Sequence, residues 1–368
     1  MRAERIFFMC SSVAWAGTEK WALRAAEEIS SSGRKVTFVA RAPEVFRERQ
    51  NLPLDIKKLP LKNDGDLLSI LSLSWLLKKE KADVLIVTRV RDYWLGGLAG
   101  RLAGVPVLLR LGVVRKLRQR HFMDYFRYGV LPSKILVNAQ AIKETLKETP
   151  WVKSDDINVI YNGVDVPGPL SEEKIQVFRN TENITQDKCL IVGAGRLAVE
   201  KRWRWLIEAV YKLHSDGKPV VCYILGEGNE RHKLEEMIKQ FRLEGVVHLP
   251  GYKKDANIWL GAADIVALPS DNEGISNTML ETMGMATPVV VTASGGVREH
   301  FSDGNNLFLA DTNDFDGFYS RTLSLVSDPT LRKELGLAGL EKVKSDFQWN
   351  SMTKKLQNLL DGMVGSDL

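Results

Sequence analysis

The chain has 368 residues, of which 44% are apolar and 26% are charged. This length exceeds what one hydrophobic core usually supports, so two domains are expected, and the composition excludes a disordered or fibrous protein. No apolar run reaches the roughly 18 residues that span a bilayer. The longest candidate, LLSILSLSWLL at residues 67–77, is interrupted by serines and predicts a buried helix face.

The N-terminus imitates a secretory signal, with Arg2 and Arg5 before IFFMC and an A-x-A pattern at residues 14–16. Cleavage there would remove the first strand of a regular βα pattern, so a cytoplasmic protein is predicted. A peripheral position on the inner face of the plasma membrane is the alternative. Cys10, Cys189 and Cys222 are odd in number and widely spaced, which predicts reduced core residues.

Charge is unevenly distributed between the two halves. Residues 1–165 contain 28 Lys and Arg against 18 Asp and Glu, whereas the remaining residues contain 23 against 28. The basic N-terminal half is therefore expected to meet an anionic partner. A nucleic acid is not expected as that partner, because no nucleic-acid-binding module accompanies the charge.

Short apolar runs alternate with helical patterns from the N-terminus onward, which is typical of parallel βαβ units. In the first half, strands are predicted at 5–11, 35–41, 55–59, 83–88, 106–110, 134–138 and 157–160. A helix at 18–32 is closed by Gly33, and the polar stretch 162–187 is a candidate linker.

The same pattern restarts after the polar stretch. Strands are predicted at 189–194, 219–225, 246–248, 264–268, 288–291 and 306–309, and only helices follow residue 312. The fold class is therefore α/β, with two doubly wound Rossmann-like domains at 1–165 and 166–348. In such sheets ligands bind beyond the carboxyl ends of the strands, so a cleft between the domains is the expected site.

The segment GAGRLAVEK, residues 193–201, directly follows a predicted strand and leads into a predicted helix at 203–214. Arg196 and Lys201 on a glycine-containing turn at a helix start suit a diphosphate. A surface Arg and Lys flanking an ordinary turn is the alternative. The segment also matches the dinucleotide fingerprint G-x-G-x-x-A, but Asp216 precedes the next strand and Glu227 follows it too late to hold a ribose.

A second segment, SDNEGISNTMLE at residues 270–281, follows another predicted strand and opens a helix at 277–285. The free backbone N–H groups at this helix start favour an anion. Glu273, in the loop, and Glu281, one turn inside the helix, offer carboxylates that accept hydrogen bonds from sugar hydroxyls. A dipole partner and a solvated helix position are the alternatives for these two residues.

Six segments in order resemble the retaining glycosyltransferases of GT-B fold in family 4, over nearly the whole chain. They are VIYNGVD at 159–165, GRLAVEK at 195–201, LGEGNERHKLEE at 225–236, LPGYKKD at 249–255, EGISNTMLE at 273–281 and GGVREHFSDGNNLFL at 295–309. EGISNTMLE carries the family's E-x7-E pattern. The resemblance implies that the helix at 349–368 crosses back onto the N-terminal domain.

The resemblance also implies roles for individual residues. Arg196, Lys201 and Glu273 are the implied catalytic residues, and Glu281 would hold the donor ribose. The implied donor-binding set is Gly17, Thr18, Gly195, Gly226, Gly251, Tyr252, Gly274, Ile275, Ser276, Asn277 and Glu281. Gly17 and Thr18 belong to AGTE, where the family has G-G-x-E.

The acceptor side departs from the family pattern, because Thr88-Arg89 and Arg110-Leu111-Gly112 stand where relatives commonly place a histidine. A basic run is the candidate acceptor or membrane side, and as a helix it could lie on an anionic membrane or cradle a phosphorylated lipid or saccharide. It consists of Arg110, Arg115, Lys116, Arg118, Arg120 and His121.

The expected activity is therefore transfer of a sugar from a UDP-, GDP- or ADP-linked donor to a hydroxyl on a saccharide or lipid-linked saccharide. Cell-surface polysaccharide or lipopolysaccharide assembly is the expected context, with retention of the anomeric configuration and no metal or other cofactor. A nucleotide-sugar epimerase of the same fold, a non-catalytic binding module and an NAD(P)-dependent oxidoreductase are the alternatives.

Overall fold

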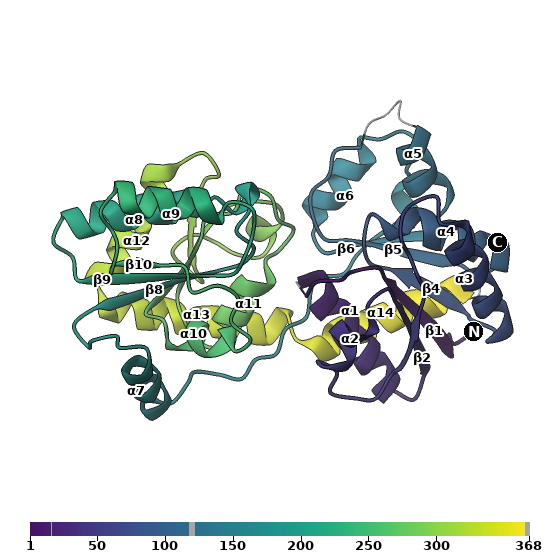
Figure 1. The fold of residues 1–368 in the computed structure, drawn as a ribbon, viewed down its shortest axis with the longest axis horizontal. Helices are drawn as coiled ribbons and strands as arrows, with labels where there is room; N and C mark the ends of the chain where they lie inside the picture. Colours follow the sequence, from purple (N-terminus) through teal and green to yellow (C-terminus); the bar gives the residue numbers. More distant parts are fainter. Residues whose placement is uncertain (16, 118–121, 365–368) are drawn as a thin grey trace. The chain divides into compact units, whose positions relative to one another are not determined.

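The computed structural model describes all residues except 16, 118–121 and 365–368. The described chain divides into two compact units. Unit 1 comprises Met1–Gly163 together with the segment that begins at Trp349, and unit 2 comprises Val164–Gln348 (Figure 1). Each unit is a parallel β-sheet covered by helices, as the alternating pattern predicts.

Unit 1 is built on a seven-stranded parallel sheet with the order β3-β2-β1-β4-β5-β6-β7. Phe8 of β1 pairs with Phe38 of β2 on one side and Ile86 of β4 on the other, which fixes the register at the centre. The strands are β1 (Arg5–Cys10), β2 (Lys35–Ala40), β3 (Asp55–Lys58), β4 (Val84–Val87), β5 (Val107–Leu111), β6 (Lys134–Val137) and β7 (Ile157–Val159).

Helices cover both faces of this sheet. On one face, α1 (Gly17–Ser31) and the closing helix α14 (Trp349–Val364) lie side by side over Ile6 and Phe8 (Figure 1). On the other face lies α4 (Asp92–Ala103), where Gly96 packs closely on Met9 and Val87. The remaining helical segments are α2 (Pro43–Arg47), α3 (Leu67–Lys79), α5 (Phe122–Tyr125), a π-helical turn (Phe126–Val130), α6 (Gln140–Lys147) and a 3-10 turn (Ser154–Asp156).

The return of α14 to unit 1 follows from its amphipathic pattern. Met352, Leu356 and Leu360 are spaced four residues apart and are buried in the core that α14 shares with α1 and the sheet. The crossing-back helix is therefore confirmed. Asp361, near its end, is held by Arg34 at 2.8 and 3.0 Å.

Unit 2 is built on a six-stranded parallel sheet with the order β10-β9-β8-β11-β12-β13. The strands are β8 (Cys189–Ala194), β9 (Val220–Leu225), β10 (Val247–His248), β11 (Ile265–Leu268), β12 (Val289–Thr292) and β13 (Phe308–Ala310). The helices are α7 (Glu172–Thr181), α8 (Trp203–Ser215), α9 (Arg231–Gln240), α10 (Ala256–Ala262), α11 (Asn277–Met283), α12 (Phe315–Ser327) and α13 (Pro329–Asp346), with 3-10 turns at Val199–Lys201 and Val297–Glu299.

Residues 67–77 form a helix, α3, with one buried face, as predicted, and Leu68 and Trp75 on its other face are exposed. Two other sequence predictions need correction. The polar stretch 162–187 is not only a linker, because α7 forms within it, capped by the side chain of Ser171. Where the basic run is described, it is not a helix: Arg110 lies in β5 and Lys116 lies in a segment without regular structure.

Arg118, Arg120 and His121 lie outside the described residues. Within the described part of the chain, no helix is both long and apolar enough to cross a membrane.

Candidate functional site

Three loops meet at the carboxyl ends of β8, β9 and β10 in unit 2. The N–H of Gly195 donates to the carbonyl oxygen of Leu225 at 2.9 Å, and the N–H of Gly226 donates to that of Gly251 at 2.9 Å. Gly226 has φ +136°, and a Cβ there would lie 2.0 Å from the carbonyl oxygen of Gly195. Only glycine therefore allows these loops to pack this closely.

The turn after β8 carries both predicted diphosphate cations. Trp203, the first residue of α8, donates from its indole Nε1 to the carbonyl oxygen of Arg196 at 2.9 Å, which fixes the turn against the helix. The Arg196 side chain is 69% exposed and forms an ion pair with Glu200. Arg196 is thus free to turn toward a ligand, because a surface ion pair of this kind contributes little to stability.

Lys201, at the end of the same turn, is in a different environment. It forms an ion pair with Glu273, and the two side chains are 23% and 14% exposed. Burial and the nearby Arg196 lower the pKa of the Lys201 ammonium, whereas the carboxylate of Glu200 raises it, and the resulting pKa is about 8. The ammonium is therefore charged at neutral pH and is held at a fixed place.

The second predicted segment forms the loop between β11 and α11. Ser276 caps α11 by accepting a hydrogen bond from the N–H of Met279, as its position before the helix predicts. The N–H of Gly296 donates to the carbonyl oxygen of Gly274 at 2.7 Å, and a Cβ on Gly295 would lie 1.6 Å from the carbonyl oxygen of Glu273. The loop after β12 thus supports the loop that carries Glu273.

The remaining members of the predicted donor set lie around the same edge of the sheet. Ile275 is buried beneath the loop, and Asn277 and Glu281 are half-buried on α11. Gly251 follows β10 with φ +81°, and the neighbouring Tyr252 is exposed. The structure therefore brings the unit 2 residues of this set to the carboxyl ends of β8, β9, β10 and β11.

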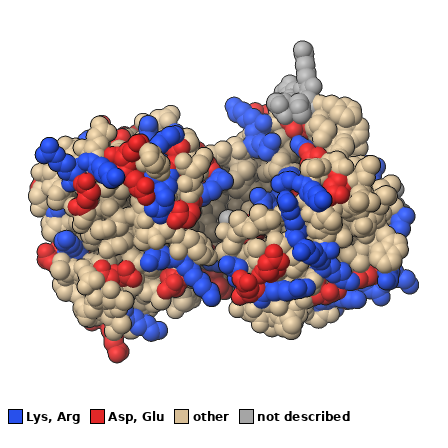
Figure 2. All heavy atoms as spheres, in the orientation of Figure 1, with Lys and Arg blue, Asp and Glu red and all other residues tan. Residues whose placement is uncertain are grey.

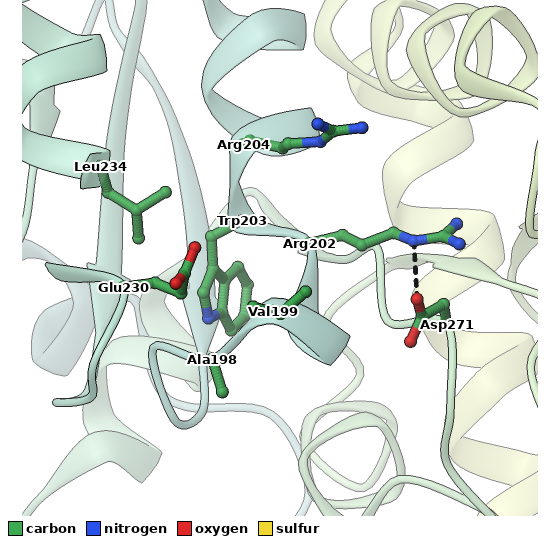
Figure 3. Close-up of a pocket in the computed structure, with 8 residues that line it drawn as sticks. All are labelled: Ala198, Val199, Arg202, Trp203, Arg204, Glu230, Leu234 and Asp271. Atoms are coloured by element: carbon green, nitrogen blue, oxygen red, sulfur yellow. Dashed lines mark hydrogen bonds and ion pairs between the residues drawn. The ribbon is translucent and has the colours of Figure 1, made fainter.

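Two residues that the sequence analysis did not single out tie the two turns together. Arg202 donates from Nε to Asp271 at 3.0 Å (Figure 3), and the N–H of Asp271 donates to the carbonyl oxygen of Glu200 at 3.0 Å. Arg202 adopts φ +50°, an uncommon conformation for a residue other than glycine. Its place directly after Lys201 could have marked Arg202 as part of the site, but the sequence does not show that Asp271 is its partner.

A shallow hollow of about 260 Å³ adjoins these turns without containing the predicted donor residues. Figure 3 shows Trp203 at its centre, facing Glu230 and Leu234. The lining residues are Ala198, Val199, Arg202, Trp203, Arg204, Glu230, Leu234 and Asp271. Since Arg196, Lys201 and Glu273 do not line it, the candidate site is the open edge formed by the loops rather than this hollow.

In unit 1, charged residues collect at the carboxyl ends of β1, β4 and β5. Gly17 begins α1, with Thr18 after it, and Glu19 in the first turn is buried and forms an ion pair with Arg89 at 3.4 Å. Arg110, at the end of β5, is also buried. Its guanidinium lies 4.1 Å from the centre of the Trp21 ring and donates to the Asn162 side chain at 3.1 Å.

One further feature of the unit 1 edge was missed by the sequence analysis. Asp92, the first residue of α4, is fully buried and accepts a hydrogen bond from the N–H of Ser11 at 2.9 Å. Burial raises the pKa of its carboxyl to about 6. Arg89, which the sequence analysis named as a departure from the family pattern, is the partner of Glu19.

Comparison with known families agrees with this arrangement. The family model described as Glycosyltransferase Family 4 matches residues 15–166, and the one described as Glycosyl transferases group 1 matches residues 188–328. The two matches together span more than three quarters of the chain. The chain belongs to the family 4 glycosyltransferases of GT-B fold, and it is a glycosyl-transfer enzyme.

Individual relatives lie in the same class. The lipopolysaccharide core biosynthesis glycosyltransferase LpsE of Rhizobium meliloti is 27% identical over 84% of this chain and 82% of its own. The capsular polysaccharide biosynthesis glycosyltransferase CapM of Staphylococcus aureus is 22% identical over 82% and 83%. The structure of Anabaena Alr3699/HepE in complex with UDP-glucose superposes with a TM-score of 0.85, at 19% identity over 97% and 99% of the two chains.

Proposed function

We propose that the enzyme transfers a sugar from a nucleoside diphosphate sugar to a hydroxyl of a cell-surface saccharide under assembly, with retention of the anomeric configuration. The observation that carries the proposal is a set of two ion pairs that join the turn after β8 to the loop after β11 in unit 2. Lys201 pairs with Glu273 and Arg202 with Asp271, so the cationic turn and the carboxylate loop form one edge. In a nucleoside diphosphate sugar the diphosphate is joined directly to the sugar. A site for this donor therefore needs cations for the diphosphate and carboxylates for the sugar hydroxyls next to each other.

In the proposed donor site, Arg196 and Lys201 bind the diphosphate. The acceptor oxygen forms a bond to the anomeric carbon, and the bond from that carbon to the phosphate oxygen breaks. The nucleoside diphosphate leaves with the electron pair, and the hydroxyl proton passes to the departing phosphate oxygen. The fixed ammonium of Lys201 stabilises the charge that develops on the leaving group, while the exposed Arg196 closes onto it.

The rest of the donor is assigned to the neighbouring loops. Glu273 accepts hydrogen bonds from the transferred sugar, together with the backbone of Gly274, Ile275 and Ser276, and Glu281 holds the ribose. The turns at Gly226, Gly251 and Tyr252 lie beside the nucleoside. UDP is the nucleotide first tested, because the similar HepE structure holds UDP-glucose.

The acceptor is assigned to unit 1, whose charge suits an anionic molecule. Lys and Arg side chains form a band across the face of this unit shown in Figure 2. The buried Arg110 and the half-buried Arg89 stand at the carboxyl edge of the sheet, where ligands bind in this class of fold. The names of the relatives LpsE and CapM motivate a lipopolysaccharide or capsular acceptor.

The first test is a thermal-shift titration of the full chain with UDP, GDP, ADP and their common sugar conjugates. A ligand that binds only the folded protein raises the unfolding midpoint, and the rise grows with the logarithm of the ligand concentration once that concentration exceeds Kd. One nucleotide is expected to give a concentration-dependent rise that weakens in Arg196→Ala and Glu281→Ala. NADH and NADPH are included, and a response to them alone would contradict the proposal.

A second measurement separates transfer from epimerisation. With the responding donor and a saccharide acceptor, nuclear magnetic resonance of the product gives the anomeric configuration of the new bond. Retention supports the proposed reaction. An inverted product would overturn the stereochemical assignment, and release of an epimerised sugar without transfer would identify an epimerase instead.

A further inference from the structure

The helix α3 presents a row of large apolar side chains to solvent. Leu67, Leu68, Leu71 and Trp75 are 68%, 76%, 60% and 60% exposed, respectively. Because helix residues three and four positions apart lie on one face, Leu68, Leu71 and Trp75 form a continuous stripe. The opposite face, with Ile70, Leu73 and Leu77, is already buried, so the row is not needed for the core.

The charged side chains within this helix are of one sign. The helix contains no Asp or Glu and ends with the exposed pair Lys78 and Lys79. The Lys79 ammonium lies 4.5 Å from the centre of the Trp75 ring. At the other end, Lys62 and Arg91 are exposed.

The acidic residues beside α3 are already engaged within the protein. Asp66 caps the helix, accepting from the N–H of Ser69, and Asp64 forms an ion pair with Arg127. Glu80 follows the helix and forms an ion pair with Lys57. The surface therefore combines a solvent-exposed apolar stripe with cations that remain available to an anionic partner.

We propose that α3 is a membrane-docking surface, on which the helix lies flat in the headgroup region of an anionic lipid bilayer. With 13 residues the helix is about 20 Å long, which is too short to span a bilayer but suits an interfacial position. Leucines would enter the acyl boundary, Trp75 would lie at the headgroup level, and Lys78 and Lys79 would contact lipid phosphates.

A bilayer fits this surface better than a second copy of the chain. In a symmetric dimer through α3, Lys78 and Lys79 would approach the same lysines of the partner if the two helices were parallel, or its exposed Lys62 and Arg91 if they were antiparallel. In both arrangements like charges would oppose association. An anionic bilayer pairs the apolar stripe and the lysines at once. The inference rests on the proposed function in one respect, because docking would give the enzyme access to a lipid-linked acceptor. Binding to the membrane itself does not require catalysis.

The test is flotation of the full chain with vesicles of phosphatidylglycerol and phosphatidylethanolamine, compared with phosphatidylcholine vesicles. Binding to the anionic vesicles is expected. Replacing Leu68, Leu71 and Trp75 together by serine is expected to lower the partition coefficient by roughly tenfold or more. Lys78→Glu with Lys79→Glu is expected to lower it by at least about twentyfold, since each basic residue contributes roughly fivefold.

Matched control variants come from the same chain. Lys354→Glu with Lys355→Glu changes a second pair of adjacent exposed lysines in unit 1, on α14, which packs on the opposite face of the sheet. Val177→Ser changes an apolar helix residue of unit 2 that is 60% exposed. Both controls are expected to bind the anionic vesicles within about twofold of the wild type.

Three results would overturn the docking proposal. One is failure of the wild type to float with anionic vesicles, and another is equal loss of binding in the α3 variants and the controls. The third is a wild-type dimer in sedimentation velocity that the triple serine variant dissociates, which would assign α3 to a protein interface. The proposed function is tested separately by the thermal shift with UDP in the absence of vesicles. A protein that responds to UDP but does not bind vesicles would contradict the docking proposal alone.

Discussion

Lys201→Met tests the proposed donor site most directly, because Lys201 belongs both to the diphosphate turn and to the ion pair with Glu273. The substitution keeps most of the apolar side-chain volume and removes the charge. It leaves the Glu273 carboxylate, 14% exposed, with the hydroxyl of Ser270 at 3.2 Å as its remaining hydrogen-bond donor in the described part of the chain. Both stability and nucleotide affinity are therefore expected to fall.

The two losses differ in size. Breaking a fully buried ion pair costs about 3–5 kcal/mol, but both side chains here reach solvent, so the free energy of unfolding of unit 2 should fall by about 2 kcal/mol. A lost hydrogen bond to a charged phosphate costs about 1.5–3 kcal/mol, which corresponds to a roughly 10- to 100-fold higher Kd for UDP.

Denaturant unfolding and isothermal titration with UDP measure these two quantities separately. Glu273→Gln serves as the reciprocal variant: it releases the Lys201 ammonium, so the Kd for UDP should stay equal or fall while sugar transfer is lost. Lys212→Met, on an exposed lysine of α8, is the matched control and should change stability by less than about 1 kcal/mol. A folded Lys201→Met protein whose Kd for UDP stays within about twofold of the wild type would refute this role for Lys201.

Two further predictions concern local geometry and pH. Gly226→Ala should place a methyl group 2.0 Å from the carbonyl oxygen of Gly195, and it should lower both the unfolding midpoint and the response to UDP. Gly245→Ala is the control, because Gly245 has φ +87° but open space around it, and this substitution should lower the free energy of unfolding by only about 1–2 kcal/mol in denaturant unfolding. Asp361→Asn should loosen α14 by removing the pair with Arg34, seen as faster hydrogen exchange in that helix; unchanged exchange would contradict it. Burial raises the pKa of Asp361, but its hydrogen bonds from Arg34 and from the N–H of Ala3, together with the charges of Arg34 and Arg2, lower it by more. Its contribution to stability is therefore full above about pH 4 and disappears as the pH falls through the folded-state pKa. The wild type should accordingly lose more stability than Asp361→Asn on acidification, and parallel pH profiles would argue against the linkage.

The sequence by itself determined the strands and the local form of the donor turns. Parallel strands covered on both faces appear as continuous apolar runs, so Val84–Val87 and Ile265–Leu268 were predicted within one residue at each end. The turns of GRLAVEK and EGISNTMLE were predictable for a related reason. A strand end, a glycine or capping serine and a helix start follow one another within a few residues.

Only the tertiary structure decided which side chains meet. Arg202 and Asp271 are 69 residues apart in the chain, and they meet because the sheet order places β8 beside β11. No local pattern contains that order, since it is set by the crossover connections between strands. Gly226 is a similar case, because its close neighbour Gly195 belongs to a different loop.

Burial of individual residues was also decided by the tertiary structure. The sequence showed Arg110 and Lys116 as one basic run, but β5 carries Arg110 into the interior while Lys116 stays exposed. In α3, the largely apolar sequence predicted the helix but not the face that is covered. Hydrophobicity reports how much surface a segment prefers to remove from water, whereas the neighbouring elements determine which part of that surface they cover.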